Sequence, residues 1–447
     1  MYFHTNHTKI MKKLLSVLLM ACWIPLYAQI KADDVKSFTL GNGMKFLVVE
    51  DNSIPNANMY LFYKAGSRNE YPGITGLSHF FEHMMFNGSK KFGPKMFDQT
   101  MEFNGGANNA YTTQNVTVYT DWFPVNALET IFDLESDRIA NLSIDPKMVE
   151  SERGVVLSER STGLENSPWR MLFDALYATA FQEHSYHWTV IGYETDIKNW
   201  TKDDLEKYFK TYYAPNNCLV VISGNVKVEE VKRLAEKYMA PIPANTPPKP
   251  VNLVEPPQTG ERRVTVKKDV PDPYLLVGYH TPDTRHKDYY ALSILSSVLT
   301  SGNSSRLYAE LVDKKQIANS VGSDFGESFD PNLFIIYAVS AKGVKESDLE
   351  DALYQEIEKI KKDGITEKEL QKIKNQKLME FYGQIETING KSNNIGTYEL
   401  FFGDYKKMFD APQEYSKVTV DEVKRVANEY FKKSNRTVAI LKSNVED

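Results

Sequence analysis

The chain has 447 residues, too many for a single ordinary domain core, so two or more domains are expected. Hydrophobic residues make up 42% and charged residues 25% of the chain, the proportions of a soluble globular protein. With 53 basic and 59 acidic residues the net charge is −6, and no basic block is present, so we expect no nucleic-acid partner.

The N-terminus has the pattern of an exported protein. Two lysines precede an apolar run over residues 14–21, and Ala28 is a small residue suited to cleavage. This pattern predicts a signal peptide over residues 1–28, and the apolar run is too short for a transmembrane anchor. We expect an exported protein, most simply in a bacterial periplasm, with lipoprotein anchoring at Cys22 as the alternative. Cys218 is alone in the mature chain, so no intrachain disulfide is expected.

The stretch GLSHFFEHMMFNG, residues 76–88, is predicted to be a helix that carries a metal site. Its apolar residues recur at three- and four-residue spacing. His79 and His83 are four residues apart and stand one above the other on a helix, with Glu82 close to the same point. This is H-x-x-E-H, the inverse of the H-E-x-x-H zinc motif. Placing these groups among Phe and Met side chains is costly unless a cation pairs with them, which favours a metal site over ordinary surface or core histidines.

The run NNAYTTQNVTVYT, residues 108–120, alternates polar and apolar residues and predicts a strand. It contains Asn109, Ala110 and Tyr111. From the residues alone, the simplest interpretation is an ordinary half-buried strand.

A second helix, over residues 145–160, offers a third metal ligand. A catalytic zinc ion needs three protein ligands and an open position for water. Glu152 and Glu159 are seven residues apart, two helical turns, and so lie on one stripe. One can bind the metal while the other supports it, and spacing alone does not choose between them. Other acidic residues of this region are interpreted as solvated charges: Glu135, Asp137 and Glu150.

The chain contains an internal duplication. An apolar strand from residue 59 leads into the helix of His79, and a similar strand from residue 274 leads into YYALSILSSVLT. Residues 200–224 resemble residues 418–443, since both pass from a helix start to a β-branched strand. We therefore predict an α+β fold of two homologous domains, each a mainly antiparallel sheet with helices packed on it.

The second repeat lacks the metal residues, because Ile294, Ser297 and Val298 stand where the first repeat has its two histidines and glutamate. Between the repeats, seven prolines fall within residues 241–257, a composition typical of a stiff, extended linker. We place the zinc-binding domain at residues 33–242, the linker at 243–259 and the second domain at 260–445.

The chain resembles the pitrilysin/insulinase family of zinc peptidases, and specifically its short members of the mitochondrial-processing-peptidase type. The resemblance covers nearly the whole mature chain and is carried by SHFFEHMMFNGS, GGANNAYTTQNVTVYT, VESERGVVLSER, HSYHWTVIGYETDI, YYAPNNCLVVISGNV and GNSSRLYAELVDKK. It implies one zinc ion per chain with His79, His83 and Glu159 as ligands. It also implies that Glu82 is the general base and that Glu152 is needed without binding the metal.

The resemblance further implies a mechanism and a mode of substrate binding. Zinc polarises the scissile carbonyl and lowers the pKa of its water toward ~7, and Glu82 passes the proton to the leaving amine. Asn109, Ala110 and Tyr111 lie in an exposed edge strand to which the substrate adds as a further strand. Such binding favours extended peptides with loose side-chain preference.

One departure from the family concerns its second domain. Active members usually carry an arginine and a tyrosine in a run resembling LREKRGLAYSV, and this pair holds the substrate carbonyl. Here the run is LVDKKQIANSV, with Val312 at the arginine position and Asn319 at the tyrosine position. A lost preorganised donor typically costs ~10²–10³ in rate.

We therefore expect one half of a clamshell: the catalytic subunit of a heterodimer whose homologous partner supplies the Arg/Tyr pair. The expected function is that of an exported zinc endopeptidase that hydrolyses peptides or small unfolded proteins in an enclosed chamber. One alternative is a self-sufficient homodimer, in which Asn319 and a nearby lysine, Lys314 or Lys315, take the oxyanion role. An alternative of another class is a non-catalytic scaffold subunit, although such relatives typically lose the zinc motif.

Overall fold

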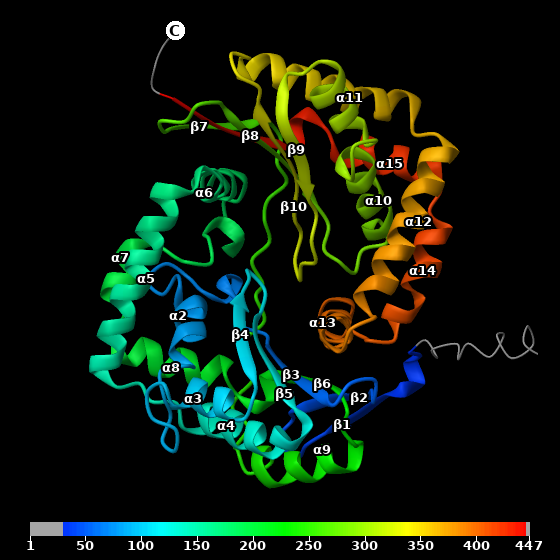
Figure 1. The fold of residues 1–447 in the computed structure, drawn as a ribbon. Coiled ribbons are helices and arrows are strands. Elements are labelled where there is room, and N and C mark those ends of the chain that lie inside the picture. The colour runs from blue at the N-terminus through cyan, green and yellow to red at the C-terminus, as the bar shows by residue number, and fades with distance from the viewer. Residues whose placement is uncertain (1–29, 444–447) are drawn as a thin grey trace, which may run out of the picture.

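The structure, a computed structural model, describes residues 30–443. The predicted signal peptide at residues 1–28, with Cys22, lies outside the described residues. The described chain forms two sheets with helices packed on them, one sheet in each half of the sequence (Figure 1). Within residues 30–443, none of the helices combines the length and the apolar character needed to cross a membrane.

The first sheet has six strands, and only β2 and β6 pair in parallel. In spatial order they are β1 (Val35–Thr39), β2 (Lys45–Glu50), β6 (Cys218–Gly224), β3 (Asn56–Tyr63), β5 (Thr117–Pro124) and β4 (Ala107–Thr112). The helices of this half are α2 (Leu77–Met84), α3 (Met96–Phe103), α4 (Leu128–Asn141), α5 (Pro146–Asn166), α6 (Pro168–Ala180), α7 (Glu194–Asn199), α8 (Lys202–Tyr212) and α9 (Val228–Leu234).

The second sheet repeats the order of the first without an equivalent of β1. Its strands are β7 (Arg262–Lys267), β11 (Arg436–Lys442), β8 (Tyr274–Thr281), β10 (Asn332–Ser340) and β9 (Ala318–Asp324), and only β7 and β11 pair in parallel. The helices are α10 (Tyr289–Thr300), α11 (Glu346–Asp363), α12 (Glu367–Gln384), α13 (Ile388–Thr397), α14 (Lys407–Lys417) and α15 (Val420–Tyr430).

The predicted α+β fold of two homologous, mainly antiparallel units is confirmed. Strands β3 and β8, which begin the two sequence repeats, occupy equivalent central positions, and β4 and β9 are equivalent edges. The helix before β6 and the equivalent helix before β11 both begin with a capping box, at Thr201 in α8 and at Thr419 in α15. In each box the threonine hydroxyl accepts a backbone N–H that would otherwise lack a partner.

The two halves interlock, because each covers one face of the other's sheet (Figure 1). Helix α13 and the short π-helical segment after it pack on the first sheet, whereas α6 packs on the second sheet. The contact at α13 is close: a Cβ atom on Gly396 would lie 2.2 Å from the ring of Phe62 in β3. The central strands of both sheets are therefore buried on both faces, and β6 is buried along its whole length.

The run at residues 108–120 differs from its prediction as one strand. It forms two antiparallel strands, β4 and β5, joined by a turn over residues 113–116. The turn residue Asn115 accepts hydrogen bonds from Tyr186 and from the backbone of Phe329, which ties the hairpin to the second half. Residues 243–259 contain no helix or strand.

The interpretation of Glu135 and Asp137 as solvated charges is wrong. Glu135 is fully buried and forms an ion pair with the equally buried Arg138, three residues further along α4. Asp137 is buried and accepts hydrogen bonds from Ser89 and from the backbone of Lys91. A buried carboxylate needs such partners. Arg138 is one helical turn from Glu135, but the partners of Asp137 lie 46 and 48 residues away, beyond the reach of helical spacing.

Candidate metal centre and active site

Helix α2 presents two different faces. Leu77, Phe80, Phe81 and Met84 are buried in the core of the first half, whereas His79, Glu82 and His83 are only partly buried. The helix has eight residues and begins after Gly76, whose φ is +90°. Its first N–H groups are satisfied by Glu70, whose buried carboxylate accepts the backbone N–H of Gly76 and of Ser78, each at 2.7 Å. This contact fixes the start of the helix, and therefore the positions of its histidines.

Helix α5 runs past this face. Asp145 caps its N-terminus by accepting the backbone N–H groups of residues 147 and 148, and Pro146 occupies the first helical position. The predicted helix over residues 145–160 thus forms and extends to Asn166. Of its two candidate glutamates, the structure brings Glu159 to the imidazole Nε2 atoms of both histidines and Glu152 to the opposite side of one ring.

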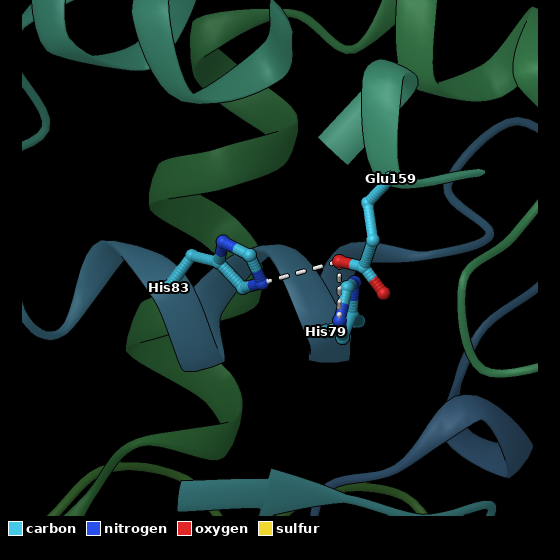
Figure 2. A group of neighbouring side chains, drawn as sticks. All are labelled: His79, His83 and Glu159. Carbon is cyan, nitrogen blue, oxygen red and sulfur yellow. Dashed lines mark ion pairs between the residues drawn. The ribbon is translucent and has the colours of Figure 1, made fainter. Parts of the chain in front are cut away.

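His79, His83 and Glu159 form a triangle (Figure 2). Oε2 of Glu159 lies 3.5 Å from Nε2 of His79 and 3.7 Å from Nε2 of His83. One ligand atom from each residue lies within 4.8 Å of the others. Among the described residues, this is the one group of three or more His, Cys, Asp or Glu with such geometry.

The triangle fits a zinc ion. Zinc binds imidazole nitrogen and carboxylate oxygen at ~2.0–2.2 Å in a tetrahedral arrangement, which places neighbouring ligand atoms ~3.3 Å apart. The two measured separations from Glu159 are within about half an ångström of that value. Two histidines and one carboxylate also leave a fourth position open, as catalytic zinc sites do.

Glu152 contacts His83 on the side of the ring that faces away from Glu159. Its Oε1 accepts a hydrogen bond from Nδ1 of His83 at 2.8 Å, and its Oε2 accepts one from the side-chain amide of Asn87 at 2.6 Å. With the proton on Nδ1, the lone pair of Nε2 faces the triangle. The two histidines differ here, because Nδ1 of His79 is buried without a hydrogen-bond partner in the described chain.

The electrostatics of the site favour neutral His79 and ionised Glu152. Burial and the nearby His83 lower the pKa of His79 to about 4, so its imidazole is free to bind a cation at neutral pH. Burial lowers the pKa of His83, but the hydrogen bond to Glu152 and the charges of Glu152, Glu82 and Glu159 together leave it above the ordinary value. The same hydrogen bond lowers the pKa of Glu152.

Glu82 lies between the metal triangle and the edge strand. Its Oε2 accepts a hydrogen bond of 2.5 Å from the hydroxyl of Thr112 in β4. Burial raises the pKa of Glu82 above its ordinary value despite this hydrogen bond, and a carboxylate with a raised pKa is a stronger base.

A cavity of about 370 Å³ opens beside these groups. Glu82 and His83 line it together with Asn109 and Ala110 of β4. Within residues 30–443, strand β4 is an edge that pairs only with β5, so its outer backbone groups face no strand of the described chain. Tyr111 does not line this cavity: it borders a separate cavity of about 310 Å³ between the two halves, and its hydroxyl donates to Asn393.

Val312 and the three residues of the alternative oxyanion site, Asn319, Lys314 and Lys315, all have other contacts in the second half. Val312 packs against the core of the second half. The amide of Asn319 donates to the backbone oxygen of Ser340 at 2.9 Å, and both Lys314 and Lys315 pair with Glu310. None of these residues lines the cavity that contains Glu82.

Sequence reasoning missed three residues that contact the site. Asn87 is four residues after His83 and follows the end of α2, so its closeness in sequence could have indicated it. Thr112 could be identified as a partner of Glu82 only with knowledge of the register of the β4–β5 hairpin. Arg170 reaches Glu159 from the neighbouring helix α6, and only the packing of the two helices reveals it.

Two adjoining segments match family descriptions. Residues 45–193 match "Insulinase (Peptidase family M16)", and residues 199–377 match "Peptidase M16 inactive domain". The second description agrees with the buried Ile294, Ser297 and Val298 at the positions of the metal residues.

Similar proteins extend the match over nearly the whole chain. A zinc protease PqqE of Helicobacter pylori is 33% identical over 432 residues, which cover 96% of this chain and 97% of that protein. A mitochondrial-processing peptidase subunit beta of Blastocladiella emersonii is 28% identical over 90% of this chain and 87% of that protein. A crystal structure of a protease from Helicobacter pylori superposes with a TM-score of 0.88 at 33% identity, over 91% of this chain and 99% of that one.

The fold and these similarities define a zinc-protease-like protein of two homologous halves. The chain belongs to peptidase family M16, the insulinase family, and its relatives include the short members of the mitochondrial-processing-peptidase type. The family resemblance found in the sequence is thereby confirmed.

Proposed function

We propose that this protein is the catalytic subunit of an exported zinc metalloendopeptidase. The observation that carries the proposal is the convergence of His79, His83 and Glu159 on one point, with Glu82 and an edge strand beside it. Relatives named zinc proteases support the same reading.

In this proposal His79, His83 and Glu159 hold one zinc ion. When bound, zinc supplies Lewis-acid polarisation of the scissile carbonyl and activation of a water molecule. Glu82 accepts the proton of the attacking water and delivers it to the leaving amine. Thr112 holds Glu82 in place, and Glu152 keeps the proton of His83 on Nδ1.

The substrate binds as an additional strand on β4. The backbone of Asn109 and Ala110, which line the cavity with Glu82, pairs with an extended peptide and brings its carbonyl toward the metal. Tyr111 borders the cavity between the halves and contributes at the end of that strand. Main-chain pairing of this kind suits peptides and small unfolded proteins, and closure of a chamber around them excludes folded proteins.

The oxyanion contacts come from a partner in this proposal. Val312 and Asn319 are engaged within the second half, so this chain has no guanidinium or phenol at the two family positions. The similarity to a protein named as a subunit of a processing peptidase supports pairing of two homologous chains. The partner would carry the Arg/Tyr pair and close the second half of the clamshell.

The remaining assignments rest on the sequence. A signal peptide at residues 1–28 directs export, most simply to a bacterial periplasm. The zinc-binding domain spans residues 33–242, the proline-rich linker 243–259 and the second domain 260–445. The interlocked helices α6 and α13 mean that these two domains act as one body.

The test combines metal analysis with a peptide assay on the purified mature chain. We expect about one zinc ion per chain and slow cleavage of a quenched fluorescent peptide, abolished by a chelator and restored by zinc. Absence of zinc binding would contradict the metal site. Stoichiometric zinc with no cleavage, alone or with a homologous partner, would instead favour a non-catalytic scaffold.

A further inference from the structure

The two carboxylate oxygens of Glu159 have different partners. Oε2 faces Nε2 of both histidines, whereas Oε1 lies 3.3 Å from Nη2 of Arg170. Arg170 is in the first turn of α6, where Ser167 caps the helix by accepting the backbone N–H of Arg170 at 3.2 Å. The start of α6 therefore determines where the guanidinium side chain leaves the helix.

Gly163 leaves space for the side chain of Arg170. It lies on α5 one turn after Glu159, and a Cβ atom at this position would lie 2.1 Å from Nη1 and 2.9 Å from Cδ of Arg170. Any other residue would push the arginine away from α5. Glycine within a helix lowers its stability. At this position the missing side chain leaves room for Arg170.

We propose that Arg170 is a positioning residue for Glu159, and that Gly163 is required for this contact. The guanidinium binds Oε1 and leaves only Oε2 for the metal, so that Glu159 binds as a single-oxygen ligand in a fixed orientation. This inference rests on the proposed zinc-binding role of Glu159.

Two other effects of Arg170 must be separated from positioning. The first is a purely structural tie between α5 and α6, but both side chains of this pair are partly exposed, and such pairs contribute little to stability. The second is repulsion between the guanidinium and a bound cation, which would make loss of Arg170 tighten zinc binding. Positioning predicts the opposite sign: zinc binding weakens while the melting temperature stays almost unchanged.

The test measures the zinc Kd of the full mature chain by competition with a chelator. We expect Arg170→Gln to raise the Kd by ~10–100-fold, the range typical of groups that orient metal ligands. Gly163→Ala should raise it in the same direction even though alanine favours the helix, so its melting temperature should not fall. Arg233→Gln is the matched control, because it removes a similarly exposed helical Arg–Glu pair on α9.

The outcomes separate this inference from the proposed function. A wild-type chain that binds no zinc refutes the proposed site itself. A wild-type chain that binds zinc, with Arg170→Gln and Gly163→Ala both within twofold of its Kd or tighter, overturns the positioning role alone. Weaker zinc binding in both variants, with the control unchanged, establishes it. If Arg170→Gln does not fold, Gly163→Ala decides by the same criterion.

Discussion

Oε1 of Glu152 lies 2.8 Å from Nδ1 of His83, on the side of the imidazole ring opposite to Glu159. The two glutamates of α5 therefore contact the same histidine through different nitrogens. One is placed to share a metal ion with it and the other to hold its proton. This difference gives the two glutamates distinct expected phenotypes.

Replacement of Glu159 by alanine removes a proposed metal ligand, and we expect the chain to lose its zinc at micromolar metal. Glu152→Ala should keep zinc, with affinity reduced ~10–100-fold, and should lose activity. Metal content of the two purified variants, dialysed against the same buffered zinc, provides the comparison. A zinc-free Glu152→Ala protein beside a zinc-loaded Glu159→Ala protein would reverse the assignment.

Glu82→Gln preserves the size of the side chain and both histidines. Because an amide cannot accept a proton from water at neutral pH, we expect turnover to fall ~10²–10⁴-fold with zinc content unchanged. Thr112→Val is the companion variant: it removes the hydroxyl that bonds Glu82 and Thr117 but keeps the Glu82 carboxylate, so it should reduce turnover less. Near wild-type hydrolysis by Glu82→Gln would exclude Glu82 as the base.

The interlock of the two halves predicts an effect at Gly396. A methyl group there meets the ring of Phe62, so we expect Gly396→Ala to destabilise the protein by ~1–3 kcal/mol. Gly154→Ala is the control: this exposed helical position has no atom within 4 Å of an added Cβ, and alanine there should stabilise by up to ~1 kcal/mol. Equal melting temperatures for the two variants would contradict the close packing of α13 on β3.

Asp174 on α6 gives a prediction for pH dependence. Burial raises its pKa from 3.8 to about 6, so the folded protein holds a proton between these values that the unfolded chain has lost. Stability from this group is thus lost as the pH rises through that window. Between about pH 4 and pH 7 the wild type should lose stability that Asp174→Asn keeps. The difference in melting temperature, variant minus wild type, should therefore increase by the equivalent of ~1–3 kcal/mol. A constant difference across this range would place the pKa of Asp174 at its ordinary value.

The missing Arg/Tyr pair predicts dependence on a partner. Alone, the chain should cleave peptides slowly, because the proposed metal and base lack the contacts that hold the substrate carbonyl. A homologous chain that carries the pair should raise the rate with saturation, and replacing its arginine should remove the gain without changing the zinc content here. A purified chain that turns over at ~1–10³ s⁻¹ alone, with no rise on adding any partner, would contradict this arrangement.

Local pattern was sufficient for the elements that carry the site. The three- and four-residue spacing around His79 and the start at Asp145 predict the two helices that form as α2 and α5, although α2 ends at Met84, before the predicted end at residue 88. The duplication predicted two related sheets, which the strand order confirms. These features depend on neighbours within a few residues along the chain, which is the range over which periodicity and capping act.

Features that depend on contacts between distant segments could not be predicted. Spacing left Glu152 and Glu159 equivalent, because the stripe they share does not indicate which nitrogen of His83 each meets. Acidic neighbours predict a solvated Glu135, whereas the packing of α4 into the core of the first half buries it. The exchange of α6 and α13 between the halves has no signature in a sequence whose proline-rich segment suggests separate domains.

The most direct test of the central claim is a zinc titration of the metal-free mature chain, with hydrolysis of a quenched peptide as the readout. We predict that the rate is zero without metal, rises in proportion to added zinc and stops rising at one equivalent per chain. Peptide hydrolysis by the metal-free chain, or zinc binding at one equivalent that Glu159→Ala leaves intact, would contradict a catalytic zinc held by His79, His83 and Glu159.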